Sequence, residues 1–149
     1  MAGAQVEIDT RQLRRAVKRL EKLAGFDRRE LLDAIGAEVE GQTRRRIEEG
    51  GPGPDGEAWP KWSEDYAKTR HAGHSLLARE GDLLDSIQFI TRGDAVEVGT
   101  NLIYAAIHQF GGDEVGMNIP ARPYLGLSPD NEADLLSVVE DFIEEALRP

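Results

Sequence analysis

The spacing of apolar residues changes along the chain, and each change predicts a new element. Val6 and Ile8 alternate with polar neighbours, which predicts a short, half-buried strand. Thr10 is a predicted N-cap, and Gly25 suits the end of the helix that follows. Between them, apolar residues recur at spacings of three and four: Leu13, Ala16, Val17, Leu20 and Leu23. The first 25 residues therefore predict a strand and then an amphipathic helix.

A second, longer helix is predicted between Asp27, a suitable N-cap, and Gly50. Its apolar stripe runs at intervals of four: Leu31, Ile35, Val39, Thr43 and Ile47. The last turns carry Arg44, Arg45 and Arg46, which complement the negative end of the helix dipole. We favour a solvated helix end for this cluster over a nucleic-acid contact.

Residues 50–60 are dense in Gly and Pro and predict an irregular loop. Trp59, at the end of this segment, and Trp62, just after it, are the only tryptophans. Large aromatic side chains beside a loop either fix it to the core or bind a partner protein, and we favour the first role here. Ser63 then predicts the cap of a short helix.

An antiparallel hairpin is predicted between residues 88 and 98. Leu83, Leu84 and Ile87 first form a helical turn after Asp82. Two alternating segments, QFITR and AVEV, then follow, joined by Gly-Asp at 93–94, a turn signal. In the second segment, Val96 and Val98 should face the same side of the sheet.

The segment IYAAIHQFGG, residues 103–112, predicts a further helix with two neighbouring stripes. Ile103, Ile107 and Phe110 form the apolar stripe, and Tyr104 and His108 form the other. Gly111 and Gly112 should end this helix and lead into an acidic loop. Next comes IPARPYLG, residues 119–126, where Pro120 and Pro123 favour extended backbone around Arg122.

The last helix is predicted from a cap at Ser128 or Asp130. Its apolar face comprises Leu135, Val139, Phe142, Ile143 and Ala146. The pattern as a whole predicts an α+β fold, in which a small antiparallel sheet packs against two N-terminal helices, a short central helix and a long C-terminal helix. We expect one domain over residues 1–149, with flexible loops near 50–60 and 111–118.

Charge is unevenly placed along the chain, which has a net charge of -10. Residues 1–50 hold nearly balanced charges, whereas the remaining residues are strongly acidic. Such a surface repels phosphate, which disfavours a nucleic-acid reader. A module centred on Arg44–Arg46 stays as an alternative, and it would bind DNA in a salt-dependent way.

Cysteine is absent, so neither a disulfide nor a thiolate metal site is expected, and folding in a reducing cytoplasm is the simplest expectation. His71 and His74 are spaced for one helical face, but Gly73 lies between them and no third ligand is near, so we interpret both as loop residues. We expect no metal and no cofactor. The N-terminus lacks a signal layout, and no apolar run approaches the roughly 18 residues of a membrane span.

His108 is the best candidate for catalysis, because no nucleophile elbow, phosphate-binding loop or zinc motif occurs. A histidine beside an apolar helix face more often bridges core and backbone through its two ring nitrogens, and we favour that role. A small hydrolase using His108 and a carboxylate is the alternative.

Four ordered segments carry a resemblance to a known family: PDGEAWPKW, REGDLLDSI, VEVGTNLIYAAIHQFGG and NIPARPYLGLS. In this order they resemble the phage virion morphogenesis proteins, which include tail completion proteins of P2-like and Mu-like phages. The matched region covers about residues 54–129, and its most specific parts are 104–111 and 119–126. Tyr124 stands where the family pattern suggests phenylalanine.

The resemblance implies a non-enzymatic structural protein of the virion neck or the head-proximal tail end, assembled in the host bacterial cytoplasm. It implies a homo-oligomeric ring, a hexamer, that meets tail-tube, tail-terminator or head-connector proteins and lets DNA pass without specific binding. The residues that it marks for assembly are these: Trp59, Trp62, Tyr104, His108, Phe110, Gly111, Pro120, Arg122, Pro123 and Tyr124. An acidic channel would let DNA slide, because like charges repel.

Overall fold

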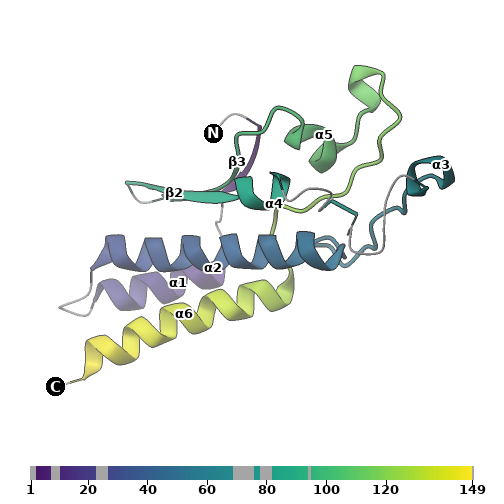
Figure 1. Cartoon of the computed structure of the whole chain (residues 1–149). Coiled ribbons are helices and arrows are strands. Elements are labelled where there is room, and N and C mark those ends of the chain that lie inside the picture. Colours follow the sequence, from purple (N-terminus) through teal and green to yellow (C-terminus); the bar gives the residue numbers. More distant parts are fainter. Residues whose placement is uncertain are drawn as a thin grey trace.

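A computed structural model describes residues 3–7, 11–22, 27–68, 76–77, 82–93 and 95–148. Within these ranges the chain has an α+β fold with a three-stranded antiparallel sheet, long N-terminal helices and a long C-terminal helix (Figure 1). The predicted fold class is therefore confirmed. Several predicted caps and turns lie outside the described residues: Thr10, Gly25 and Asp94.

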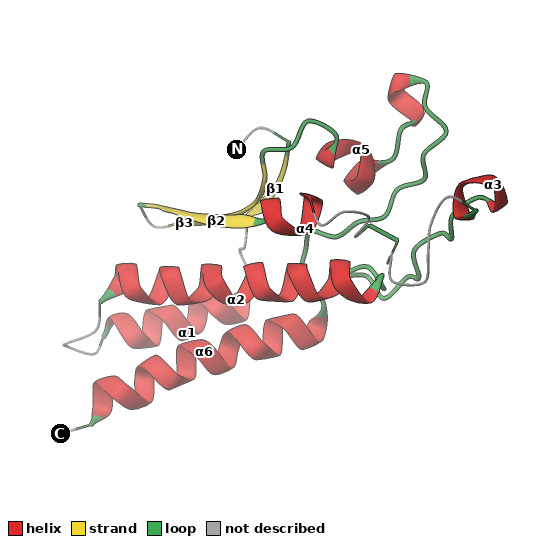
Figure 2. Ribbon diagram, in the orientation of Figure 1, coloured by secondary structure: helices red, strands yellow, loops and turns green. Residues whose placement is uncertain are grey.

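The sheet has β3 (Ala95–Thr100) at its centre, between β1 (Ala4–Glu7) and β2 (Gln88–Arg92). Phe89 lies opposite Val98 in the register of the predicted hairpin. Val96 and Val98 are both buried on one face, as the alternation predicted. That face is the one covered by α2 (Arg28–Glu49) (Figure 2).

Helix α2 begins and ends where its sequence predicts. The carboxylate of Asp27 accepts hydrogen bonds from the backbone N–H groups of Arg29 and Glu30, and Gly50 takes a left-handed conformation (φ 77°) that ends the helix. Its close approach to the sheet depends on Gly36, where a Cβ atom would lie only 2.4 Å from the ring of Phe89. Close packing of α2 on the hairpin therefore requires a residue without a side chain.

Two more helices complete the long-helix layer. Helix α6 (Pro129–Leu147) packs against both α1 (Arg11–Glu21) and α2 (Figure 1). Ser128, rather than Asp130, caps α6, in a capping box with Asn131. Buried leucines and valines fill the contacts between the three helices: Leu13, Leu20, Leu31, Leu135 and Val139.

The shorter helices lie towards the end of the molecule opposite the C-terminus (Figure 2). They are α3 (Glu64–Ala67), capped by Ser63 as predicted, α4 (Asp82–Ser86), α5 (Ala105–Phe110) and the 3-10 turn η1 (Asp113–Val115). None of the described helices is both long and apolar enough to cross a lipid bilayer.

The apolar stripe predicted for residues 103–110 does not pack in the core. Helix α5 begins only at Ala105, which is fully buried, so Ile103 lies before it and is 94% exposed. Phe110, at its end, is 72% exposed. A six-residue helix is too short to present a continuous buried stripe, and its backbone is held instead by the segment 119–126.

Candidate assembly site

Residues 119–126, IPARPYLG, form the centre of the candidate site, and we call them the clasp. They run between η1 and α6 with no regular secondary structure. The two prolines, Pro120 and Pro123, remove two backbone donors and disfavour helix, as the sequence predicted. The backbone groups of the clasp are therefore available to other elements, and three such elements use them.

Tyr124 fixes α5 to the clasp. Its side chain is fully buried, and its hydroxyl donates a hydrogen bond to the carbonyl oxygen of Ala105 at 2.8 Å. The backbone N–H groups of Tyr124 and Leu125 both donate to Oε1 of Gln109, each at 3.0 Å. Burial raises the pKa of the Tyr124 phenol, so the side chain stays a neutral donor. The hydroxyl of Tyr124 thus makes a buried hydrogen bond within the chain.

Arg122 joins the clasp to the segment before α3. Its backbone N–H donates to the carbonyl oxygen of His108 at 2.7 Å, and its Nε donates to that of Pro60 at 2.8 Å. Nη2 reaches the carbonyl oxygen of Lys61 at 3.3 Å. Burial lowers the pKa of Arg122, since its guanidinium has lost most of its water. Backbone carbonyl oxygens take the place of that water as acceptors for the N–H groups of the guanidinium.

Trp59 anchors the loop 50–60 to the same segment. It is 5% exposed, its Nε1 donates to the carbonyl oxygen of Pro123 at 2.9 Å, and Gly51 lies directly against its ring. The predicted core role of Trp59 is confirmed. Trp62 is half-buried, donates to the carbonyl oxygen of Leu76 at 3.2 Å and meets the ring of Tyr66 edge-on.

Arg46 is buried, which corrects the prediction of a solvated arginine cluster. Its Nη1 donates to the carbonyl oxygen of Tyr124 at 2.6 Å and, at 3.4 Å, to that of Gly126. Its Nη2 donates to the side-chain oxygen of Asn131 in the capping box of α6. One side chain of α2 therefore holds both the clasp and the start of the last helix, and burial lowers its pKa.

The other two arginines of the cluster also make contacts within the chain. Arg44 donates to the carbonyl oxygen of Ile87 at 2.8 Å and pairs with Glu40, while Arg45 lies 3.7 Å from Glu38. Arg44–Arg46 consequently do not form an open basic patch for phosphate groups, as the nucleic-acid alternative requires.

His108 lies on α5 beside Tyr104, whose ring it meets edge-on at 5.7 Å between centroids. Its Nδ1 is buried and has no hydrogen-bond partner among the described residues, so the prediction that both ring nitrogens bridge to the core and backbone is wrong for this atom. Burial, and then the positive charge of Arg122, lower the pKa of His108. The histidine is therefore held in its neutral form.

Among the described residues, the arrangement that a hydrolase would need is not assembled around His108. Asp82 lines the same small pocket, yet within the described part of the chain no carboxylate hydrogen-bonds to the ring. Nor do the described residues bring three or more metal-binding side chains together. His71 and His74 lie outside the described residues.

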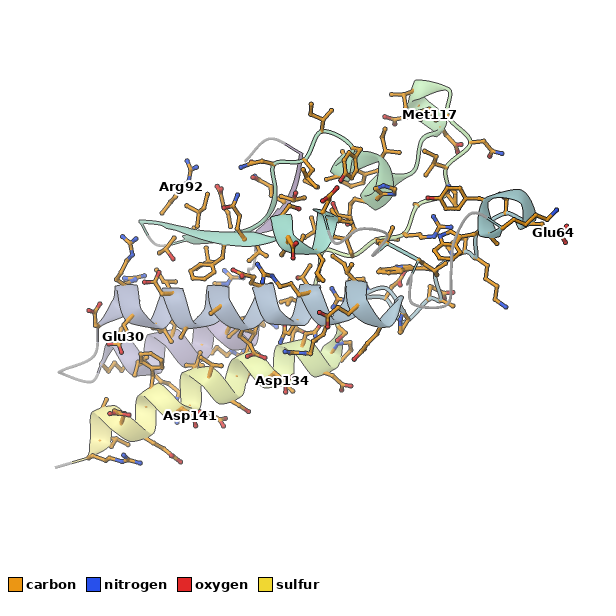
Figure 3. All side chains as sticks on the ribbon, in the orientation of Figure 1. Glu30, Glu64, Arg92, Met117, Asp134 and Asp141 are labelled. Atoms are coloured by element: carbon orange, nitrogen blue, oxygen red, sulfur yellow. The ribbon has the colours of Figure 1, made fainter. Side chains whose placement is uncertain are left out.

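An apolar surface projects from the structure just before the clasp. The residues with exposed apolar side chains in this segment, which we call the ridge, are Ile103, Tyr104, Phe110, Val115 and Met117. Figure 3 shows Met117 at the outer tip of this projection. Beside it lies a groove of about 730 Å³, lined by Trp62 and Phe110 among others. Gly111 (φ 84°) turns the chain between α5 and η1.

Three residues that hold the clasp were not identified from sequence: Arg46, Gln109 and Asn131. For Arg46 a signal was present, because it falls seven residues after Val39 and three after Thr43 and so lies on the inward stripe of α2. The prediction nevertheless placed Arg46 in solvent, because its side chain is positively charged. For Gln109 no local pattern marks the contact with a segment fifteen residues later.

These observations define a class. Among the described residues, buried polar side chains fix a backbone segment that lies next to an exposed apolar ridge, and such an exposed apolar surface is typical of a protein that binds other proteins. Comparison with known sequences agrees: the profile of the phage virion morphogenesis family matches residues 8–145, and the chain belongs to this family.

Two of its relatives come from a phage and a prophage. Protein G of Escherichia phage Mu is 30% identical over 96% of each chain. Its name describes it as a capsid assembly protein. The Mu-like prophage FluMu G protein 2 of Haemophilus influenzae is 34% identical over 93% of this chain and 96% of its own. No solved structure matches the chain. The protein is thus a phage virion assembly protein.

Proposed function

We propose that the chain is a non-enzymatic tail completion protein that forms a hexameric ring at the neck or head-proximal end of the tail. The observation that carries the proposal is the ridge, in which Ile103 is 94%, Phe110 72% and Val115 64% exposed, next to a helix α5 that hydrogen bonds fix to the clasp. Exposed apolar side chains on a fixed support suit a surface that is covered in an assembled particle.

The groove beside the ridge supports the same role. It is bounded by Trp62, Tyr66, Phe110 and Ile119, so aromatic and apolar side chains line a concave surface next to a convex one. A tail-tube, tail-terminator or head-connector protein is the proposed occupant. Aromatic side chains dominate the binding energy of such contacts when they become buried.

Charge supports passage of DNA through the ring. With a net charge of -10, the chain repels the phosphate backbone, so DNA slides through a channel of such subunits without sticking. A basic channel in a map of the assembled ring would contradict this part of the proposal.

Particles made without the protein test the function. Electron microscopy of such a lysate should show full heads and separate tails, because the joining ring is missing. The purified chain, mixed with tail-tube or connector protein, should form a complex of larger mass. A lysate that contains normally joined, infectious particles would overturn the proposal.

A further inference from the structure

Helices α1 and α6 carry outer faces of opposite charge. Helix α1 has five basic side chains and one acidic one, and α6 has seven acidic and no basic ones. The inner faces of the two helices, including Leu13, Leu20, Leu135 and Val139, are buried in the core. Both charged faces are therefore left on the outside of the molecule.

Each face forms a line along its helix. Arg11, Arg15 and Lys18 are exposed and recur at spacings of four and three, which places them in one stripe of α1. Exposed acids recur at four, seven and four residues along α6, in the stripe Asp130, Asp134, Asp141 and Glu145. Figure 3 shows Asp134 and Asp141 along α6, on the side of the molecule away from Met117 and the ridge.

Among the described residues, these charges form no ion pairs. Ion pairs do form elsewhere, for example between Arg28 and Glu21 at 3.2 Å. Arg11, Arg15 and Lys18 have no ion-pair partner within the described ranges, and neither do the four acids of the α6 stripe. Within this part of the chain, both stripes can therefore form ion pairs with another molecule.

We propose that the basic face of α1 in one subunit binds the acidic face of α6 in the next copy of the chain. The contact joins two different patches, which is the heterologous arrangement that a closed ring requires. Helix α1, about 16 Å long, fits alongside part of α6, about 28 Å long. This inference rests on the proposed ring and names the surface by which its subunits meet.

A second copy suits these faces better than DNA does. The basic stripe is short, and α6, with its seven acids, packs directly against α1 in the same subunit. DNA would neutralise only the basic stripe and would leave the acidic stripe of α6 without a partner. The acidic side chains of a neighbouring α6, in contrast, can pair with the basic side chains of α1, and both charges are then neutralised.

Charge reversal tests the contact. One full-length variant carries Arg11→Glu, Arg15→Glu and Lys18→Glu, and the other carries Asp134→Lys, Asp141→Lys and Glu145→Lys. In sedimentation at low salt, wild type should self-associate, and each variant alone should associate about tenfold more weakly or worse, since like charges then face each other. An equal mixture should recover association, because the acidic α1 of one variant meets the basic α6 of the other.

A matched control keeps the change in net charge but moves it off α1. The variant Arg29→Glu, Arg45→Glu and Arg92→Glu reverses three exposed cations on α2 and β2 and should associate as wild type does. Circular dichroism of all variants separates loss of contact from loss of fold. Added salt should weaken the wild-type complex, because these pairs are exposed.

Several outcomes overturn the inference: a wild-type chain that is monomeric at low salt, a mixture that fails to recover association, or a control as weak as the α1 variant. DNA binding that wild type shows and the α1 variant loses, without self-association, would assign the face to DNA. The proposed function is refuted by a different result. If the purified protein is monomeric but particles made without it are tailless heads, only the α1–α6 contact is refuted. If the purified protein associates but particles made without it are normal, only the role at the neck is refuted.

Discussion

The guanidinium of Arg46 and the carbonyl oxygen of Tyr124 lie 2.6 Å apart although 78 positions separate them in sequence. This hydrogen bond ties the end of α2 to the clasp, and the second nitrogen of Arg46 reaches Asn131 at the start of α6. The long-helix layer and the segment that supports the ridge are therefore joined through one buried side chain.

Replacing Arg46 with Met should destabilise the fold by about 3 kcal/mol, because it removes donors that carbonyl oxygens in the interior require. Arg46→Lys should recover only part of the loss, since a single ammonium cannot replace a planar fork of donors. Urea denaturation measures both. Arg45→Met is the matched control, and with a side chain 56% exposed it should change stability by less than about 0.5 kcal/mol. Equal stability of the two Met variants would refute the role of Arg46.

Tyr124→Phe should cost about 1–2 kcal/mol, because the buried carbonyl oxygen of Ala105 loses its donor at unchanged side-chain shape. Wild type should also lose stability at alkaline pH. The folded pKa of Tyr124 is raised above its ordinary value of 10.0, so its contribution is complete below pH 10 and is lost as pH rises further. Denaturation at pH 8 and pH 11 should show a smaller decrease for Tyr124→Phe than for wild type. An identical decrease would contradict this account.

Elements specified by local signals were predicted well from sequence. The cap at Asp27, the end at Gly50, the antiparallel hairpin and the capped start of α6 depend on residues a few positions apart, and the structure confirms each of them. Side chains that act at long range were predicted poorly. Arg46 was assigned to solvent because a charged residue usually remains exposed unless it is paired, and its neutral partners lie far away in sequence.

The segment 103–110 also shows what local sequence patterns do not predict. Its apolar spacing predicted a helix with an apolar stripe, but the spacing of apolar residues does not distinguish a core face from a face that binds another protein. The structure begins the helix only at Ala105 and leaves Ile103 and Phe110 exposed. The exposure of these side chains, which the sequence did not predict, is the observation on which the functional proposal depends.

His108 should titrate below its ordinary pKa of 6.5, first because it is buried and second because Arg122 is near. A group with a lowered folded pKa contributes fully above the unfolded value, and its contribution is lost as pH falls below 6.5 towards the folded pKa. Stability of wild type should therefore decrease between pH 7 and pH 5 by more than that of His108→Gln. Proton NMR of the ring gives the pKa directly, and a value at or above 6.5 would contradict the environment described.

Phe110→Ser and Ile103→Ser separate assembly from folding. Both side chains are mostly exposed, at 72% and 94%, so each change should alter the free energy of unfolding by less than about 0.5 kcal/mol. If the ridge is covered in the virion, phage carrying either variant should produce far fewer joined particles, because a buried aromatic or aliphatic anchor is lost.

Leu147→Ser provides the matched control for the ridge variants. Leu147 is also apolar and 64% exposed, but it lies at the end of α6, away from the ridge (Figure 1). Plaque counts and electron microscopy should find this variant as infectious as wild type. If all three serine variants assemble normally, the ridge is not a contact surface. If Leu147→Ser is as defective as Phe110→Ser, loss of any exposed apolar side chain is enough, and the location of the ridge explains nothing.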